Sequence, residues 1–388
     1  MSNKNLLSGR DKELQELAEQ YEAAMAENKP FYQDADELAD LADWYRTKKK
    51  YDKAFEIAEY GLKLHPDSTE LMIEYAYLHL DSGKKAKARE IIENLPDTYS
   101  PEAKVVRAHL LLSEGKLDDA EQLLDTIEDK DDLANVVDVS YMYLDMGYPD
   151  KALAWLDPVK EEYSNEEAYI AVVADCLYGK SMTEEAIPLY NRLIDMNPYS
   201  APYWFGLARC HFEEMNFNQA IDACDYALVS DDEFADAYVM KGHCFYQLGN
   251  EDAALECYLK AKELHGLAPE FIYTYIGLCK VSKGEWEEGY ENLEKAIQEN
   301  ETDEALSPML PNLYANAGLC LSKMGKKRKA HQYCKKAHKL APEDPESLLI
   351  EGRIYIEEGD YDKGIKQWAK ALNLSLIHIS EPTRHAQI

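Results

Sequence analysis

Eight cysteines are the residues of this chain whose chemistry is easiest to recognise, because thiolates bind zinc and form disulfides. No two of them enclose just two residues, the spacing that many zinc sites use. Five recur at intervals of 34, 34, 35 and 41 residues: Cys176, Cys210, Cys244, Cys279 and Cys320. The same spacing, continued towards the N-terminus, falls on Met142, Leu110 and Leu78. We therefore interpret these thiols as small hydrophobic side chains and predict neither a metal site nor disulfides.

Motifs that would indicate catalysis are missing from the sequence. The ten histidines form no HExxH pair, and the chain has no GxxxxGK[ST] phosphate loop, dinucleotide-binding glycine run or GxSxG nucleophile elbow. Pairs of Asp and Glu are frequent, but they fall on faces of predicted helices that face water. We therefore expect no catalytic residues and no cofactor, and we predict that the chain is not an enzyme.

Small residues that return at a fixed interval indicate how the chain is organised. One series, at steps of 32 to 41 residues, consists of Ala54, Ala88, Ala120, Ala152, Ala186, Ala220, Ala254, Gly289, Ala330 and Gly364. A second series, twelve residues earlier each time, consists of Ala42, Ala76, Ala108, Ser140, Ala174, Ala208, Gly242, Gly277, Gly318 and Gly352. Such a period indicates one supersecondary unit repeated along the chain.

Residues 201–234 show what each repeat must be. An apolar stripe at helical spacing consists of Trp204, Leu207, Ala208 and His211, and a second stripe consists of Phe217, Ala220, Ile221, Cys224, Ala227 and Leu228. Two amphipathic helices with a short joint make an αα-hairpin. The two small residues lie one on each helix, where they would allow the two backbones to approach closely.

Glycine and proline mark where the helices should end. Seven glycines stand five residues before the second small residue, namely Gly83, Gly115, Gly147, Gly249, Gly284, Gly325 and Gly359. Glycine ends a helix by adopting a positive φ at little steric cost. Pro66, Pro198 and Pro342 stand twelve residues after the second small residue, where the second helix should stop.

This pattern resembles the tetratricopeptide repeat, with about ten repeats that begin near residues 35, 69, 101, 133, 167, 201, 235, 270, 311 and 345. In that family's phase the small residues are repeat positions 8 and 20. Ala227-Leu228 and Ala371-Leu372 match the family's Ala at position 27 and the apolar residue that follows it. The resemblance implies an all-α, right-handed superhelical solenoid over residues 35–373, in which the first helix of each hairpin lines the concave face.

The resemblance also implies where a partner would bind. Ligands of that family contact first-helix positions 2, 5, 9, 12 and 13. In repeats four to seven these positions include the groove residues that we expect to bind a protein or peptide: Tyr141, Tyr178, Phe205, Arg209, Phe212, His243 and Tyr246. Exposed aromatic side chains beside an arginine are typical of binding hot spots. The alternative is that the curvature of the solenoid buries these rings against one another.

The two ends of the chain differ from the repeats. In residues 1–34 a helical stripe formed by Leu14, Leu17, Ala18, Tyr21 and Met25 predicts a capping helix on the first repeat, or alternatively a coiled-coil arm. Apolar residues almost alternate after residue 373, and residues 374–384 resemble a translated sequencing adaptor. We interpret residues 374–388 as a non-native tail, with a genuine disordered tail as the alternative, and expect the natural chain to continue past residue 373.

Two departures from the regular repeat are open to a functional reading. The insertion at residues 301–311 is either a plain surface loop or a loop that contacts the ligand. The ninth repeat is basic, with Lys323, Lys326, Lys327, Arg328, Lys329, Lys335, Lys336 and Lys339. This lysine patch is either a solvated helix surface or a docking site for an acidic partner or a second copy of the chain.

The charge of the chain limits its partners. Lys and Arg number 42 against 74 Asp and Glu, which gives a net charge of −32 over 388 residues. A field of that sign repels phosphate backbones and anionic membranes, so we expect no nucleic-acid and no membrane partner, although basic partners are favoured. The first ten residues lack the apolar core of a signal peptide, and no apolar run reaches the roughly 18 residues of a membrane span. We expect a cytoplasmic protein.

These observations favour a scaffold or adaptor that binds a peptide or helix in its concave groove. Two alternatives stay open. The chain could be the recognition arm of a larger enzyme or regulator whose effector domain follows residue 373, or a structural solenoid that assembles with itself. The sequence does not identify the partner, the pathway or the oligomeric state.

Overall fold

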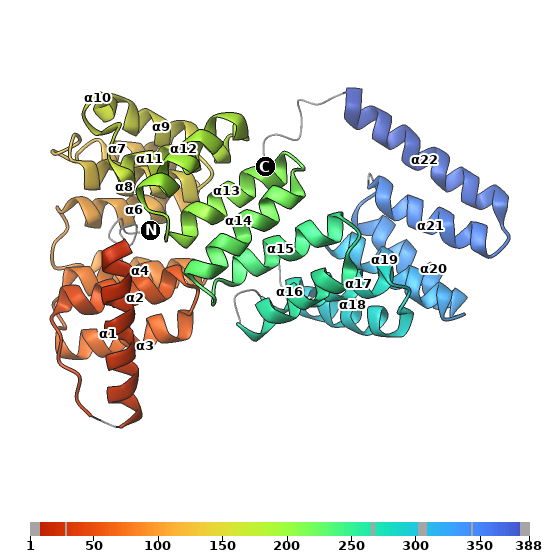
Figure 1. Cartoon of the computed structure of the whole chain (residues 1–388), viewed down its shortest axis with the longest axis horizontal. Helices are drawn as coiled ribbons and strands as arrows, with labels where there is room; N and C mark the ends of the chain where they lie inside the picture. The colour runs from red at the N-terminus through yellow and green to blue at the C-terminus, as the bar shows by residue number, and fades with distance from the viewer. Residues whose placement is uncertain (1–7, 28, 265–267, 302–308, 343, 381–388) are drawn as a thin grey trace. The chain divides into compact units, whose positions relative to one another are not determined.

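The structure, a computed structural model, describes residues 8–27, 29–264, 268–301, 309–342 and 344–380. Helices and turns make up these ranges, and they contain no β-strand (Figure 1). The chain divides into two compact units, which are considered separately: a first unit up to Phe234 and a second unit from Ala235. The predicted all-α architecture of stacked αα-hairpins is confirmed.

The first unit consists of a leading helix and a row of hairpins. After α1 (Ser8–Ala26), the hairpins pair α2 (Ala35–Thr47) with α3 (Tyr51–Leu64), α4 (Thr69–Asp81) with α5 (Lys85–Glu93), α6 (Pro101–Ser113) with α7 (Leu117–Leu124), α8 (Leu133–Asp145) with α9 (Pro149–Leu156), α11 (Glu167–Gly179) with α12 (Thr183–Met196), and α13 (Ala201–Glu213) with α14 (Phe217–Ser230). A 3-10 turn, η2 (Asp157–Val159), and the short helix α10 (Lys160–Tyr163) separate α9 from α11.

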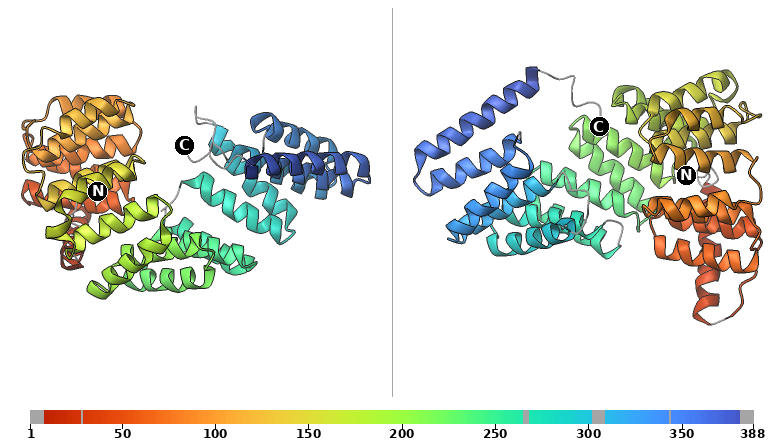
Figure 2. Two further views of the ribbon diagram at one scale, coloured as in Figure 1. Left: turned by 90° about the horizontal axis from the view of Figure 1, so that it is seen from above. Right: turned by 180° about the vertical axis from the view of Figure 1, so that it is seen from behind.

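The second unit continues the same pattern. It pairs α15 (Ala235–Gln247) with α16 (Glu251–Glu263), α17 (Pro269–Ser282) with α18 (Trp286–Glu301), α19 (Leu310–Lys323) with α20 (Lys327–Leu340), and α21 (Pro345–Glu357) with α22 (Tyr361–Ser380). Both views in Figure 2 show the helices lying in pairs joined by short turns. Every first helix begins within one residue of the start that the sequence predicts.

Local side-chain chemistry fixes where several first helices begin. An Asp or Ser at the N-cap accepts a hydrogen bond from a backbone N–H of the first turn in five of them, at Asp34, Ser68, Ser100, Asp132 and Asp344. Such caps satisfy donors that the helix itself leaves without partners. The second helices α3, α12 and α20 end two residues before the prolines that were expected to stop them.

The paired small residues make the close contacts that the repeat requires. A Cβ placed on Gly352 would lie 3.0 Å from the carbonyl oxygen of Gly364, and one on Gly318 would lie 3.2 Å from that of Ala330. In another hairpin the Ser140 hydroxyl donates to the Ala152 carbonyl at 3.2 Å. The backbones of the two helices therefore meet at these positions, which explains why larger side chains are not found there.

The joints between the helices of each hairpin use one conformation. The seven predicted glycines have φ between +71° and +86°. Three joints place other residues in the same region, with φ of 58° at Lys49, 56° at Ser181 and 57° at Met215. This left-handed conformation costs a non-glycine residue about 1–2 kcal/mol because its Cβ approaches the following carbonyl.

The joint at Met215 offers a direct test of this cost. The Met215 side chain is 75% exposed, so its removal sacrifices little packing. Met215→Gly is expected to raise the free energy of unfolding by about 1 kcal/mol, the lower end of the left-handed penalty. Urea denaturation measures the change, and Gly249→Met, at a joint with φ of +71°, is expected to shift stability in the opposite direction. Shifts of the same sign in both variants would contradict the explanation.

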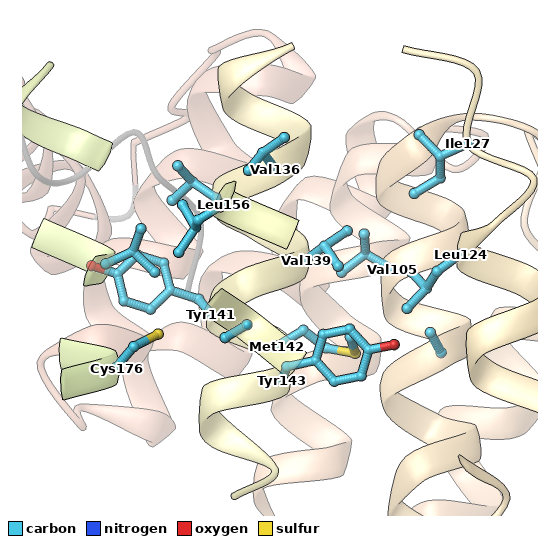
Figure 3. Close-up of a cluster of buried hydrophobic side chains, with 14 of the residues drawn as sticks. Val105, Leu124, Ile127, Val136, Val139, Tyr141, Met142, Tyr143, Leu156 and Cys176 are labelled. Carbon is cyan, nitrogen blue, oxygen red and sulfur yellow. The ribbon is translucent and has the colours of Figure 1, made fainter. Parts of the chain in front are cut away.

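The core is a chain of local clusters rather than one centre. In the first unit one cluster spans the third to fifth hairpins and includes Val105, Leu124, Val139, Met142 and Leu156 (Figure 3). Another joins α1 to α2 and α3, where Leu14, Ala18 and Tyr21 are buried and the Tyr21 ring contacts Phe31 and Tyr60 edge-on at 5.4 and 5.9 Å. The apolar stripe of α1 thus covers the side of the first hairpin.

Two predicted departures from the repeat fall partly on residues outside the described ranges. The insertion at residues 301–311 falls largely on residues 302–308, which lie outside the described residues. The backbone of α22 remains helical through Ser380, although the apolar spacing changes after residue 373. Residues 381–388 also lie outside the described part, and the non-native origin of residues 374–388 stays a prediction.

Candidate functional site

One continuous layer of first helices forms the inner face of the first unit. The helices α2, α4, α6, α8, α11 and α13 each contact the next one in the row, whereas neighbouring second helices contact each other far less. The row therefore curves with the first helices on the inside, and we call this face the inner layer. The first joint of this unit contacts the segment that follows its last helix: Lys48 Nζ lies 2.6 Å from Asp231 Oδ2, and Lys50 Nζ lies 2.6 Å from Glu233 Oε2.

Five of the seven predicted groove residues lie on the inner layer of the first unit. Tyr141 on α8 is only 5% exposed, whereas Tyr178 on α11 and Phe205, Arg209 and Phe212 on α13 are half-buried. The burial of Tyr141 agrees with the alternative that curvature covers some of the rings. His243 and Tyr246 lie on α15 of the second unit, where both are half-buried.

Asp175, which occupies groove position 9 of the fifth repeat but was not among the residues expected to bind a partner, is the centre of this group. Its Oδ1 accepts hydrogen bonds from the Tyr190 hydroxyl at 2.7 Å and from Arg209 Nη2 at 2.8 Å, and its Oδ2 accepts one from Tyr141 at 3.3 Å. Burial is the larger cause, and the Asp175 carboxylate the second, that raises the pKa values of Tyr141 and Tyr190 well above the ordinary value of a tyrosine. Both phenols therefore remain protonated and keep donating.

The Arg209 guanidinium joins this charged centre to the aromatic side chains. It lies 4.3 Å from the centre of the Tyr178 ring and 5.5 Å from that of Phe205, within the range of cation–π attraction. Phe205 packs edge-on against Phe234 at 5.0 Å. Because Asp175 neutralises Arg209, the surface presents aromatic rings to a partner rather than an unpaired positive charge.

The two groove residues of the second unit belong to another aromatic cluster. His243 Nδ1 shares a hydrogen bond of 2.8 Å with the Tyr258 hydroxyl, and the Tyr275 ring lies 4.5 Å from the imidazole in an edge-on contact. Tyr258 and Tyr275 stack on each other at 5.1 Å. Burial lowers the pKa of His243 to about 4, so the imidazole is neutral at pH 7. Burial also raises the pKa of Tyr246.

A charged cluster that the sequence analysis missed lies on the same inner layer, on α2 and α4. The Arg46 guanidinium is hydrogen-bonded to Asp43, and it lies 3.4 Å from Glu74 and 3.5 Å from Asp81. It also lies over the Tyr77 ring at 5.1 Å. Repeat positions 9 and 12, which selected Tyr141 and Tyr178, select Asp43 and Arg46 when the same rule is applied to the first repeat.

An acidic cavity of about 60 Å³ opens beside this cluster, between α4, α6 and α8. Its polar lining consists of Glu74, Tyr77, Glu102, His109, Asp138 and Asp145, and its apolar lining of Ile73, Val105 and Met142. Tyr77 and His109 meet edge-on at 5.7 Å. Burial lowers the pKa of His109 to about 4, so this ring adds no positive charge at neutral pH.

Comparison with known proteins identifies the repeats. A family model for the tetratricopeptide repeat matches residues 45–110, a second one matches residues 311–344, and a model for subunit 3 of the anaphase-promoting complex, or cyclosome, matches residues 179–261. Residues 45–110 and 311–344 thus match the tetratricopeptide repeat.

The relatives and a solved structure agree with this assignment. TPR repeat-containing protein MJ1428 of Methanocaldococcus jannaschii is 23% identical over 87% of this chain and 64% of its own length. TPR repeat-containing protein YpiA of Bacillus subtilis is 25% identical over 77% of this chain and 62% of its own length. The chain thus spans less than two thirds of each relative. The APC/C hetero-tetramer Cut9-Hcn1 shares the fold, with a TM-score of 0.52 at 15% identity over 88% of this chain and 87% of that one.

The tetratricopeptide phase accounts for the cysteines. All eight are buried. Burial raises the pKa to about 12 for the five at repeat position 10, Cys176, Cys210, Cys244, Cys279 and Cys320, so these thiols stay protonated and pack as small apolar groups. Within the described ranges no group of three or more His, Cys, Asp or Glu side chains is arranged to hold a metal ion.

The lysine patch of the ninth repeat is partly engaged within the second unit. Lys329 lies 5.1 and 5.4 Å from the Tyr290 and Tyr333 rings, and Lys336 lies 4.6 Å from Tyr314. Lys323 pairs with Glu357 at 2.8 Å. These contacts show that at least three of the cations have partners inside the unit, and a docking role for the patch stays a prediction.

Proposed function

We propose that this chain is a protein-interaction scaffold whose first unit holds a peptide or a helix against the aromatic side chains of α11 and α13. The observation that carries the proposal is the half-buried row of Tyr178, Phe205 and Phe212 on the inner layer, beside Arg209. Partly exposed rings held by a rigid helical layer bury much area at little entropic cost when a partner covers them.

The chemistry of the surface favours apolar anchors in the partner. Asp175 already pairs with Arg209, so a carboxylate of the partner would have to compete with it at 2.8 Å. The rings of Phe205 and Phe212 instead accept aliphatic or aromatic side chains, which a helix presents at every third or fourth residue. His243 and Tyr246 would offer a similar surface in the second unit.

We further propose that the partner is a protein, and not a nucleic acid or a membrane. The net charge of −32 opposes contact with polyanions. In the part of the chain that the structure describes, no helix is both long enough and apolar enough to span a bilayer. The cytoplasmic location and the two alternatives, a recognition arm and a self-assembling solenoid, stay predictions.

Removing the two phenylalanines tests the proposed capture. A random peptide library displayed on phage supplies binders of the wild-type chain, and fluorescence anisotropy measures their Kd. Phe205→Ala combined with Phe212→Ala is expected to weaken binding at least tenfold, since each lost anchor costs more than about 1 kcal/mol. Both rings are already partly exposed, so the melting temperature is expected to change little.

A matched pair on the same hairpin controls for general loss of aromatic surface. Trp204 and Tyr226 stack on each other at 4.5 Å but occupy repeat positions outside the set expected to face ligands. Trp204→Ala combined with Tyr226→Ala is expected to leave Kd unchanged. Equal weakening by both pairs, or none by the groove pair, would contradict the proposal, and loss of cooperative unfolding in the groove pair would identify Phe205 and Phe212 as core residues.

A further inference from the structure

Two runs of opposite charge meet across the first unit. The joint after α2 consists of three consecutive lysines, and the segment after α14, residues 231–234, begins with Asp, Asp and Glu. Lys48 Nζ lies 2.6 Å from Asp231 Oδ2, and Lys50 Nζ lies 2.6 Å from Glu233 Oε2. Each pair joins residues that are 183 positions apart in the sequence. The two ion pairs therefore link the first hairpin of the unit to this segment, which we call the closing segment.

Backbone hydrogen bonds hold both partners of this contact in place. Lys50 N donates to a carbonyl oxygen near the end of α2 at 2.9 Å. In the closing segment, Asp231 Oδ1 accepts from the Glu233 N–H at 3.1 Å, and the Asp231 carbonyl accepts from the Phe234 N–H at 3.2 Å. Asp231 therefore folds the segment into a turn with one carboxylate oxygen and joins it to Lys48 with the other.

The two pairs differ in their exposure to water. The Lys48 and Asp231 side chains are 25% and 26% exposed, whereas those of Lys50 and Glu233 are 33% and 58% exposed. Partly buried pairs are screened less by salt than exposed ones. Lys48 also lies 5.0 Å from the centre of the Trp44 ring, within the range of cation–π attraction. We therefore expect the Lys48 pair to hold the closing segment more tightly than the Lys50 pair.

The closing segment ends on an aromatic side chain that contacts the proposed binding surface. Phe234 is half-buried, and its ring lies 5.0 Å from the Phe205 ring in an edge-on contact. The repeat register did not select Phe234, because it is the last residue of the sixth repeat and lies outside the first-helix positions that ligands of this family contact. Phe234 thus adds a partly exposed ring beside Phe205.

We propose that Phe234 is a further residue of the peptide-binding surface, and that Lys48 and Lys50 are positioning residues that hold it there through the closing segment. The inference rests on the proposed peptide capture and adds a residue to that site. A ring that is held in place before the partner arrives loses less conformational entropy on binding than a free one. The two lysines therefore affect affinity without contacting the partner.

Affinity measurements on single and combined variants test this inference. With the tightest-binding peptide from the phage library, Phe234→Ala is expected to raise Kd at least tenfold, as the loss of an aromatic anchor does. Lys48→Glu combined with Lys50→Glu, the lysine-reversal variant, replaces attraction by repulsion and is expected to raise Kd at least fivefold. When Phe234→Ala is already present, the lysine reversal should alter Kd less than twofold, because the ring that the lysines position is gone. An undiminished effect in that background would overturn their positioning role.

Reversing the charge on the other side distinguishes positioning from a general loss of structure. Glu233→Lys, added to the lysine-reversal variant, recreates an ion pair of opposite polarity with position 50 and is expected to bring Kd back to within twofold of the wild-type value. As a control, Lys63→Glu combined with Lys87→Glu makes the same charge change at exposed positions of α3 and α5, and Kd should not change. Equal weakening by the control would show that net charge, and not the closing segment, determines the affinity.

Hydrogen exchange measures the closing segment without any ligand. In the lysine-reversal variant, the amides of Glu233 and Phe234, whose hydrogen bonds form the turn, are expected to exchange at least fivefold faster than in the wild-type chain. The control variant should leave both rates unchanged. Equal rates in the wild-type chain and in the lysine-reversal variant would overturn the role assigned to the lysines.

The outcomes also separate this inference from the capture on which it rests. If Phe205→Ala with Phe212→Ala weakens binding but Phe234→Ala does not, the scaffold stands and the added residue is wrong. If the library yields no binder, the proposed capture fails together with the role of Phe234 in it, while the exchange rates still decide whether the lysines hold the closing segment.

Discussion

Replacing Arg46 with methionine is expected to lower the free energy of unfolding by about 3–5 kcal/mol at pH 8, the usual cost of removing one partner from a buried ion pair. Arg46 is 8% exposed and is the cation that faces Asp43, Glu74 and Asp81. Methionine keeps much of the side-chain volume, so the loss reports on charge rather than on a cavity. Asp43 and Glu74 are then left buried without the guanidinium that compensates them.

The loss should be smaller at acidic pH. Burial holds the pKa of Glu74 near 8 against an ordinary value of 4.5, so the folded state binds this proton more tightly than the unfolded state does. Stability that comes from such a group is fully present below pH 4.5 and disappears as the pH rises through 8. Without Arg46 the carboxylate has less compensation, so its pKa rises further. Arg46→Met should therefore cost less at pH 5 than at pH 8.

Urea denaturation at both pH values measures this effect. Lys53→Met serves as the control, because the Lys53–Glu22 pair is exposed and such pairs contribute about 1 kcal/mol or less. Arg46→Lys keeps the charge but not the fork of donors, and an intermediate loss is expected. A loss below 1 kcal/mol for Arg46→Met at pH 8, or a larger loss at pH 5 than at pH 8, would contradict the role assigned to the buried cluster.

The fold follows from the sequence because one packing constraint repeats in every hairpin. Positions 8 and 20 must both be small where the two backbones touch, as Gly352 and Gly364 do. These positions fix the phase of each repeat, and caps such as Asp34 and glycines such as Gly83 then fix the ends of the helices. The joints at Lys49, Ser181 and Met215 show the limit of the glycine signal, because the tertiary fold imposes the same positive φ without it.

The candidate site could be predicted only in part. The repeat register predicts on which face of its helix a side chain lies, but not which residues that side chain contacts. The register selected Tyr141 as a groove residue, yet Tyr141 is buried and donates to Asp175 of the next repeat. Asp175 and Arg209 occupy position 9 of adjacent repeats, 34 residues apart, so the register places them on neighbouring helices, but it does not show that the carboxylate accepts a hydrogen bond from the guanidinium. Glu74 was missed because it occupies position 6, which is outside the family's ligand-contacting positions.

The other charged centre of the inner layer leads to the second large prediction. Asp175→Leu is expected to lower the free energy of unfolding by about 2–3 kcal/mol, since it leaves Arg209 without a counter-charge and two tyrosine hydroxyls without an acceptor. The expected loss is smaller than at Arg46, because the Asp175 and Arg209 side chains are 25% and 28% exposed and water compensates part of the charge.

A double-mutant cycle with Arg209→Met shows whether the centre acts as one network. Stability losses from two partners of one ion pair do not add, so the double variant Asp175→Leu with Arg209→Met is expected to lose at least 1 kcal/mol less than the sum of the two single losses. Leu193→Ala is a control without a direct bond to Asp175, and its loss should add to that of Asp175→Leu within about 0.5 kcal/mol. Additive losses for Asp175 and Arg209 would mean that water already satisfies each charge, and Arg209 would then be free to bind a carboxylate of the partner.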